Sequence, residues 1–436
     1  MEIFNVGMTL TEKIIAKAAG RDSVKAGENV WVKINVLMTH DVCGPGTIGI
    51  FKKKFGEDAQ VFDKENVVII PDHYIFTKDS KANRNIDILR DFVNEHELPH
   101  FYEPNTENYM GVCHVTLPEK GHVRPGEIIL GTDSHTCTHG ALGAFATGVG
   151  NTDAAFALGT GKTWLKVPET IKFVLNGTLP KSMMAKDLIL HIIGKIGFDG
   201  ATYCAMQFEG EVVDALSMDE RMTICNMAIE AGGKNGVMAA DQKTIDYVKA
   251  RTDVPFELFE ADADANYKAV YEINVSELEP IVAAPHSPDN KKAVRDVLET
   301  PLTRAYIGSC TGGKITDFEA AAQVMKGKKV AIDTFIVPST TFVEKQMNER
   351  EIDGTTLMQI FKDAGCRIGP PSCAACLGGP DDSFGRTHND EVVISTTNRN
   401  FPGRMGSMQA SVYLASPYVA SASALTGKIT DPTEYL

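Results

Sequence analysis

Ile-Ile-Leu-Gly-Thr-Asp-Ser-His, residues 128–135, is the stretch that decides the fold class. A short apolar run ends in a polar turn that starts with glycine. Short strands that are apolar on both faces belong to sheets covered on both sides. Polar residues directly after such strands are typical of α/β proteins, in which sites collect at the carboxyl ends of the strands.

A similar arrangement, an apolar run directly before polar residues, occurs three more times. The other apolar runs are residues 67–70, before Pro71-Asp72-His73; residues 305–308, before Ser309-Cys310; and residues 392–395, before Thr397-Asn398-Arg399. Between such runs we expect helices over 142–165 and 316–326, the second opening with the capping-box spacing of Thr316 and Glu319. This alternation predicts an α/β protein with parallel or mixed sheets.

Two changes of composition divide the chain. Residues 166–169 separate a segment rich in glycine and alanine from a new strand-like run. Residues 283–290 contain two prolines among polar neighbours, as linkers do. We therefore predict three domains, over residues 1–165, 166–285 and 286–436. A chain of 436 residues with 43% hydrophobic content can form several hydrophobic cores of this size.

The composition argues against membranes and nucleic acids as partners. No run reaches the roughly 18 apolar residues of a membrane span, and residues 1–7 lack the features of an export signal. We expect a cytoplasmic protein, whose nine cysteines serve metal binding or catalysis more than disulfides. A net charge of −14 offers no basic excess for nucleic acid, and an anionic substrate would need local arginines.

Three of the nine cysteines form the most specific pattern. Cys310 lies in Ile-Gly-Ser-Cys-Thr-Gly-Gly, and Cys373 and Cys376 lie in Pro-Ser-Cys-Ala-Ala-Cys-Leu-Gly-Gly-Pro. Three thiolates are one too few for a closed four-coordinate metal site. A cubane iron–sulfur cluster held by three protein thiolates leaves one iron open, so that this iron can act as a Lewis acid.

Each part of this pattern also has a simpler interpretation. The Cys373 and Cys376 pair alone suits a zinc or a redox site, although no second pair and no His-x-x-x-His accompanies it. Cys310 alone is compatible with a small buried residue, but its position ahead of a helix and among glycines favours a thiolate. The remaining cysteines are expected to be structural: Cys43, Cys113, Cys137, Cys204, Cys225 and Cys366.

Carboxylate and imidazole groups stand side by side after two of the four strands, in Asp72-His73 and in Asp133-Ser134-His135. A neighbouring carboxylate orients and tunes a histidine that acts as a general acid. A structural role is the alternative for either histidine taken singly. Two such pairs at two strand ends favour catalysis.

Two arginines stand five residues apart in Asn-Arg-Asn-Phe-Pro-Gly-Arg, residues 398–404. The planar guanidinium of arginine binds a carboxylate through two hydrogen bonds. A solvated surface pair is the alternative, but the flanking glycine and proline indicate a shaped loop. Arg399 and Arg404 are therefore candidates for binding an anionic substrate.

Taken together, these motifs resemble the aconitase family over nearly the whole chain. The segments that carry the resemblance are residues 8–13, Thr39-His40-Asp41, Pro71-Asp72-His73, 131–136, the Cys310 and Cys373/Cys376 segments, 398–406 and 424–427. The resemblance implies three α/β/α domains around a central cleft, without the fourth, swivelling domain of full-length aconitases.

The resemblance also implies a hydro-lyase with one [4Fe-4S] cluster, whose ligands would be Cys310, Cys373 and Cys376. The catalytic residues that it implies are Asp72, His73, His114, Asp133, His135 and Glu230. Among them, His73 corresponds to the acid that protonates the departing hydroxyl. The substrate-binding residues that it implies are Asn226, Asn398, Arg399, Arg404 and Ser134, with the arginines holding substrate carboxylates.

Two departures from full-length aconitases refine this expectation. Residues 42–46 read Val-Cys-Gly-Pro-Gly where those enzymes have a glutamine, which disfavours citrate. The reaction that the resemblance implies is then the interconversion of 2- and 3-isopropylmalate through isopropylmaleate, in leucine biosynthesis. The chain ends at Leu436, without the swivelling domain that carries the serine base and two more arginines. We therefore expect a heterodimer, in which a separately encoded small subunit supplies that domain to complete a site for a small 2-hydroxy dicarboxylic acid.

Three other functions remain open at this stage. Within the family, the chain suits the large subunit of a homoaconitase or of a methylmalate or 2,3-dimethylmalate hydratase, because the small subunit would contact the variable part of the substrate. An RNA-binding regulator that senses cluster loss is disfavoured by the net charge of −14. A structural zinc protein without a reaction is the third alternative, which metal and sulfide analysis would separate from the others.

Overall fold

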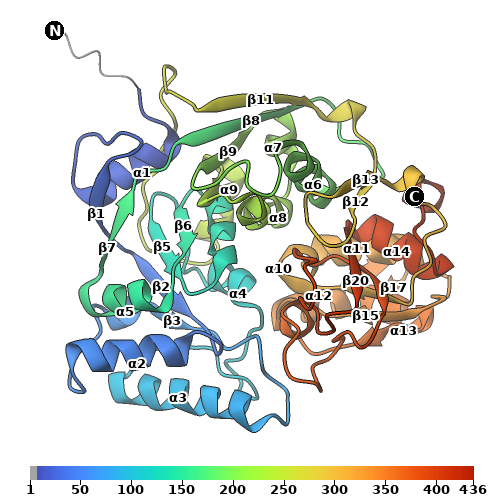
Figure 1. The fold of residues 1–436 in the computed structure, drawn as a ribbon, viewed down its shortest axis with the longest axis horizontal. Helices are drawn as coiled ribbons and strands as arrows, with labels where there is room; N and C mark the ends of the chain where they lie inside the picture. The colour runs from blue at the N-terminus through green and yellow to red at the C-terminus, as the bar shows by residue number, and fades with distance from the viewer. Residues whose placement is uncertain (1–6) are drawn as a thin grey trace.

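The computed structural model describes residues 7–436 and shows an α/β protein with three large sheets. In Figure 1 the sheet of the first part of the chain lies at the lower left, the second at the top and the third at the right. The predicted fold class, with parallel and mixed sheets, is confirmed. The domain boundaries near 166 and 286 remain a prediction. The prediction that residues 1–7 lack an export signal falls mostly on residues 1–6, which lie outside the described part of the chain.

The first large sheet has five parallel strands in the order β4-β3-β2-β5-β6. Strands β2, β3 and β5 are buried at every position, as in sheets covered on both faces. The strand bounds are β2 Val36–Thr39, β3 Val67–Ile69, β4 His100–Phe101, β5 Ile128–Gly131 and β6 Phe145–Gly148. The helices are α1 Leu10–Ala19, α2 Gly44–Phe55, α3 Ser80–His96, α4 Cys113–Glu119 and α5 Asn151–Thr160. A separate antiparallel ribbon joins β1 (Asn29–Lys33) to β7 (Lys162–Lys166).

The prediction of one helix over residues 142–165 is wrong for most of that range. Only α5 is helical there, and it lies between strands β6 and β7. Gly161 ends α5 in the left-handed conformation, with φ 65°, and β6 pairs in parallel with β5. The helix expected over 316–326 is confirmed as α11 (Ile315–Met325), although the Asp317 carboxylate, which accepts from the Lys314 N–H at 2.9 Å, takes the expected capping role of Thr316 and Glu319.

The second large sheet has four parallel strands in the order β10-β9-β8-β11. The strand bounds are β8 Thr170–Asn176, β9 Ala205–Glu209, β10 Asn235–Val237 and β11 Ala269–Asn274. The helices are α6 Ala185–Ile196, α7 Glu211–Ala215, α8 Met218–Asn226 and α9 Gln242–Lys249. Helix α8 contacts elements of both other parts, because it packs on the 3₁₀ helix η2 (Ser134–Leu142) and on α10 (Ser309–Gly312).

The third large sheet has seven strands in the order β13-β12-β20-β19-β14-β15-β18, with β12 antiparallel to both of its neighbours. The strand bounds are β12 Ile281–Ala283, β13 Lys291–Ala293, β14 Arg304–Ile307, β15 Asp333–Ile336, β18 Arg367–Ile368, β19 Val392–Ser395 and β20 Ser411–Ala415. Strands β16 (Glu351–Ile352) and β17 (Thr355–Thr356) form a short antiparallel pair. The other helices of this part are α12 Thr341–Glu349, α13 Leu357–Ala364 and α14 Pro417–Thr426.

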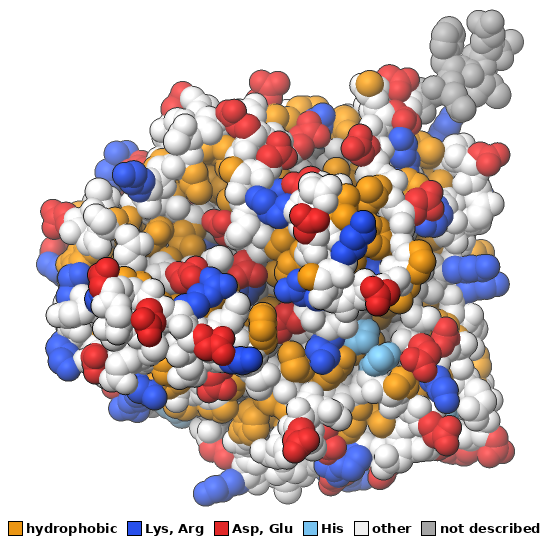
Figure 2. Space-filling model, turned by 180° about the vertical axis from the view of Figure 1, so that it is seen from behind, with side chains coloured by type: hydrophobic (Ala, Val, Ile, Leu, Met, Phe, Trp, Pro, Cys, Tyr) orange, Lys and Arg blue, Asp and Glu red, His pale blue; other side chains and the backbone are white. Residues whose placement is uncertain are grey.

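All four strand-and-turn motifs predicted from the sequence form strands β3, β5, β14 and β19. Strands β3 and β5 flank β2, and β14 lies beside β19, each pair of neighbours being parallel. Within each of the two sheets, the polar turns therefore lie close together at the carboxyl ends of the strands. Within residues 7–436 no helix has the length and apolar character needed to cross a bilayer. Figure 2 shows acidic and basic side chains mixed over the face in view, which carries no broad basic surface.

Candidate active site

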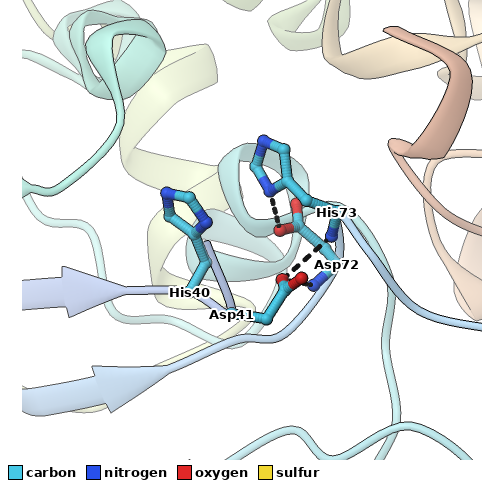
Figure 3. A group of neighbouring side chains, drawn as sticks. All are labelled: His40, Asp41, Asp72 and His73. Atoms are coloured by element: carbon cyan, nitrogen blue, oxygen red, sulfur yellow. Dashed lines mark hydrogen bonds and ion pairs between the residues drawn. The ribbon is translucent and has the colours of Figure 1, made fainter. Parts of the chain in front are cut away.

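The turn that follows β3 is held in place by a carboxylate from the neighbouring strand. Asp41, just after β2, is fully buried and accepts from the backbone N–H groups of Asp72, His73 and Tyr74 at 2.9, 3.0 and 2.7 Å. Figure 3 shows this carboxylate directed at the backbone of the turn. Charge-assisted hydrogen bonds are among the strongest in proteins, so Asp41 fixes the backbone from which the His73 ring projects.

His73 is oriented by Asp72, as the sequence predicts for a general acid. The Nδ1 atom of His73 lies 2.6 Å from Oδ1 of Asp72, whose other oxygen accepts from the Cys113 N–H at 2.7 Å. Burial favours the neutral ring, but the carboxylates of Asp72 and Asp133 outweigh it and raise the pKa of His73 well above its ordinary value. His73 therefore retains two N–H groups, of which Asp72 engages one.

Asp133 contacts three histidines at the end of β5. Its carboxylate lies 2.9 Å from Nε2 of His114, 3.3 Å from Nδ1 of His135 and 3.6 Å from Nε2 of His73. Burial alone would raise the pKa of Asp133, yet these rings, with His114 first among them, hold it well below its ordinary value. An ionised carboxylate thus lies among three imidazoles, which is an arrangement suited to holding and moving protons.

Glu230 joins the histidine group to the predicted carboxylate-binding loop. It lies in the 3₁₀ helix η3 (Met227–Ala231), with one oxygen 2.8 Å from Nε2 of His135. The Nε–H of Arg399 donates to both Glu230 oxygens, at 2.8 and 3.0 Å, while its Nη2 donates to the Ser134 hydroxyl at 3.0 Å. Burial alone would raise the pKa of Glu230. The charge of Arg399, with the contribution of His135, outweighs burial, so the pKa of Glu230 lies below its ordinary value.

The three predicted ligand cysteines come together from two loops of the third sheet. Cys310 lies in α10. Cys373 directly precedes the 3₁₀ segment Ala374–Cys376, and Cys376 is its last residue. All three cysteines belong to one buried group with Val112 and Val115. The sulfurs of Cys373 and Cys376 are 3.2 Å apart. Their hydrogen bond outweighs burial and lowers the pKa of Cys376 to about 5, while the same bond and burial raise the pKa of Cys373 well above its ordinary value. Without a metal the pair therefore favours one thiolate, at Cys376.

Amide and guanidinium groups surround these sulfurs. The side-chain amides of Asn226 and Asn398 donate to the Cys310 sulfur at 3.1 and 3.3 Å, and they lie 3.3 Å from each other. A guanidinium nitrogen of Arg404 lies 3.9 Å from the sulfur of Cys376. Donors directed at sulfur stabilise the thiolate form, which is the form that binds metal. Burial outweighs them at Cys310 and raises its pKa to about 12, so the charge of a bound metal would be needed to hold this thiolate.

The structure thus brings all the predicted site residues into one network, although their roles remain predictions. Sequence reasoning did not assign a role to Asp41 or to His40, whose ring stacks on His73 at 4.3 Å between centroids. The signal was present, since Asp41 follows an apolar strand as Asp72 and Asp133 do. Burial, followed by the charge of His73, lowers the pKa of His40, so this ring is neutral beside its charged neighbour.

Among residues 7–436, two groups of histidine and aspartate side chains, neither containing a cysteine, also have the spacing of a metal site. They are His40, Asp41, Asp72 and His73, and His114, Asp133 and His135, each with ligand atoms within 4.8 Å. Most of these atoms already bond to one another or to backbone N–H groups. The three thiols are the better metal-binding group, because the side chains directed at the Cys310 and Cys376 sulfurs from outside this group are donors, which leave the sulfur lone pairs available for a metal.

Substrate access is indicated by the few site side chains that are not fully buried. The Asp133 side chain is 15% exposed and the Arg399 side chain is 20% exposed, whereas His73 and Glu230 are each 3% exposed. The site therefore opens where Arg399 and Asp133 lie. A cavity of about 670 Å³ lies elsewhere, against α9, α11 and α12, and includes none of the predicted site residues. The polar network, and not this cavity, marks the candidate site.

Comparisons with known proteins agree with this architecture. The model of the aconitase family (aconitate hydratase) matches residues 12–304 and 295–427. The chain is 54% identical over 443 positions to the chloroplastic 3-isopropylmalate dehydratase large subunit of Arabidopsis thaliana, covering 99% of this chain and 87% of that protein. It is 47% identical over 429 positions to a probable 3-isopropylmalate dehydratase large subunit of Methanothermobacter thermautotrophicus, covering 98% of this chain and 99% of that protein.

A solved structure shares the fold at low sequence identity. The crystal structure of aconitase X from Thermococcus kodakaraensis, in its holo form, matches with a TM-score of 0.50 and 14% identity. The match covers 87% of this chain and 88% of that one. At this identity the likeness concerns the fold alone.

Proposed function

The chain belongs to the aconitase family, and we propose that it is the large subunit of a 3-isopropylmalate dehydratase. This hydro-lyase would interconvert 2- and 3-isopropylmalate through isopropylmaleate. The observation that carries the proposal is the convergence of three thiols, the Asp72–His73 pair and Arg399 in one buried network. The choice of substrate is supported by the names of relatives that match almost the entire chain.

The three thiols fit the [4Fe-4S] cluster that the family implies. Cys310, Cys373 and Cys376 would hold it, and the amides of Asn226 and Asn398 would bond to the sulfur of Cys310. When bound, the cluster supplies a Lewis-acidic iron that favours the departure of a hydroxyl group.

His73 is the proposed proton donor to the departing hydroxyl. Its Nδ1–H bonds to Asp72, so the Nε2–H, which faces Asp133, is the proton available for transfer. Asp41 holds the backbone beneath it, and the His40 ring, stacked on His73, limits its rotation. The proton is thus held at one stated atom before the substrate arrives.

Arg399 is the proposed carboxylate-binding residue of this chain. Its Nε–H is engaged by Glu230 and one Nη2–H by Ser134, so the guanidinium plane is already oriented without substrate. A preorganised fork binds a carboxylate with less loss of entropy than a free side chain. Arg404, beside Cys376, is placed to contact the same ligand.

A separately encoded small subunit is the proposed partner. The relatives that match 98% of this chain over 99–100% of their own length are named large subunits. By the family resemblance, the small subunit would contribute the base that removes the substrate proton and further carboxylate-binding groups. This chain would then bind one side of the diacid and protonate its hydroxyl.

The proposal is tested by reconstitution. We expect anaerobically purified chain to contain iron and acid-labile sulfide and, once mixed with its small subunit, to convert 3-isopropylmalate with an unsaturated intermediate detectable by ultraviolet absorbance. Cys310→Ser should abolish both the visible cluster absorbance and turnover, whereas Cys366→Ser, which changes a half-buried cysteine outside the network, should leave both intact.

Two results would contradict this assignment. Stoichiometric zinc without sulfide in the native protein would favour a structural zinc site. Preferred turnover of homoaconitate or 2,3-dimethylmalate by the reconstituted enzyme would retain the reaction class but change the substrate.

A further inference from the structure

Lys186 is a fully buried cation without a carboxylate partner. It lies in α6, beside the second sheet, with 1% of its surface exposed. Within residues 7–436 no carboxylate oxygen lies within 4.0 Å of its ammonium. Lys314, the other fully buried lysine nearby, differs in having Asp317 at 3.5 Å. The carboxylates of Asp317 and Asp187 act on Lys186 only from a longer range, and the charge of Lys314 opposes them. A buried charge without a directly paired opposite charge is unfavourable, because its interaction with water is lost and only partly replaced.

The ammonium of Lys186 crosses into the third part of the chain and joins two turns of the candidate site. It donates to the carbonyl oxygens of Thr396 and Thr397 at 2.8 and 2.6 Å, and it lies 3.5 Å from the Thr311 hydroxyl. Thr311 follows Cys310 directly, and Thr397 precedes Asn398, whose amide donates to the Cys310 sulfur. The charge thus lies behind the two turns that present Cys310 and its amide donor.

Neutral acceptors do not account for a charged residue at this position. A buried ammonium bonded only to carbonyl and hydroxyl groups is destabilising, and burial lowers the pKa of Lys186 to about 7. An apolar side chain of similar length would avoid that penalty at the loss of two hydrogen bonds. Three metal-binding thiolates bring three negative charges to this region, and the charge of an iron–sulfur core offsets them only in part.

We propose that Lys186 is a positioning residue whose ammonium is the counter-charge of the anionic cluster held by Cys310, Cys373 and Cys376. The inference rests on the proposed function, since it requires that cluster. Lys186 would act on the cluster in two ways. Its hydrogen bonds set the distance between the turn that carries Cys310 and the turn that carries Asn398, and its positive charge stabilises the protein with the cluster bound. Net charge and surrounding hydrogen bonds are the means by which a protein tunes such a cluster.

The test separates charge from hydrogen bonding with three variants at one position. Lys186→Met removes both, Lys186→Gln keeps a donor without the charge, and Lys186→Arg keeps both. Lys172→Met is the matched control, because Lys172 is a partly buried lysine of the second sheet that pairs with Glu209 at 2.6 Å, outside the network. Each full-length chain is measured with and without reconstituted cluster.

Two readouts besides turnover are followed: the rise in melting temperature on cluster loading, and the rate of iron loss to a chelator. We expect Lys186→Met and Lys186→Gln to lose iron about ten-fold faster and to show a smaller rise in melting temperature, as removal of a nearby unit charge predicts. Lys186→Arg and Lys172→Met should stay close to the native protein in both.

The possible outcomes test the role of Lys186 separately from the proposed function. If the native chain takes up no cluster, the proposed function fails and the inference fails with it. If the native chain loads and the Met and Gln variants retain iron equally well, only the counter-charge is refuted. If Lys186→Met lowers the melting temperature equally with and without cluster while iron loss is unchanged, Lys186 has a purely structural role and the proposal is overturned.

Discussion

Replacing Asp41 with asparagine should loosen the turn that carries His73 without touching the ring. The Asp41 carboxylate accepts three backbone N–H groups, those of Asp72, His73 and Tyr74. Asparagine offers one oxygen in their place, and its NH₂ group would face the Tyr74 N–H, which is itself a donor. The side chain is fully buried, so water cannot replace the lost acceptor.

The expected size follows from the number and type of these bonds. A hydrogen bond to a charged group contributes roughly 2 kcal/mol, and a neutral one contributes roughly 1 kcal/mol. Asp41→Asn exchanges three bonds of the first type for two of the second, a loss of about 4 kcal/mol in the free energy of local opening. At about 1.4 kcal/mol per factor of ten, the three amides should exchange hydrogen several hundred-fold faster.

Hydrogen exchange with mass spectrometry measures this directly on the peptide that contains residues 72–74. The matched control is Asp79→Asn, because Asp79 also accepts two backbone N–H groups, of Lys81 and Ala82 at 2.9 and 2.8 Å, but at the start of α3. Asparagine and aspartate are nearly equivalent at a helix N-cap, so the control should change exchange little.

Turnover should fall together with protection, since a displacement of about 1 Å at a catalytic group costs about a hundred-fold in rate. Native-like exchange of residues 72–74 in Asp41→Asn would refute the reasoning. So would a change in exchange of the same size in Asp79→Asn, because the effect would then come from the loss of charge in general and not from the Asp41 contacts.

Three further predictions concern single residues. His73→Asn should lower kcat by about 10²–10⁴ in the reconstituted enzyme while the visible cluster absorbance stays native, and loss of the cluster would remove His73 from the proton-transfer role. Arg399→Lys should mainly raise KM, because the charge remains but the planar fork is lost; an unchanged KM would exclude Arg399 from substrate binding. Burial raises the pKa of Glu119 from 4.5 to about 8, so the folded chain holds a proton that the unfolded chain releases, and stability falls as pH rises through this window. Glu119→Gln, which keeps an acceptor for the Thr340 hydroxyl, should flatten the fall of melting temperature between about pH 5 and pH 8 relative to the native chain, and an identical slope would contradict the assignment.

Local patterns were sufficient for the strands and for their chemical turns. The apolar runs before His73, His135, Cys310 and Arg399 form strands β3, β5, β14 and β19. Three or four consecutive apolar residues directly before a turn have few alternatives to a buried strand. The same reasoning failed over 142–165. Strand β6 exists through its parallel pairing with β5, and no local preference of Phe145–Gly148 signals that partner.

The sequence by itself determined which residues could do chemistry: the three cysteines of one pattern, the paired carboxylates and imidazoles, and the two arginines of one loop. Only the tertiary structure decided what those residues contact. Asp133 lies among three histidines, Glu230 links His135 to Arg399, and Lys186 reaches the turns around Cys310 from a helix of another sheet. The contacts of Glu230 and Lys186 join residues from 95 to 211 positions apart in the chain. Burial and pairing over such separations depend on how the sheets pack together, which no local stretch of sequence encodes.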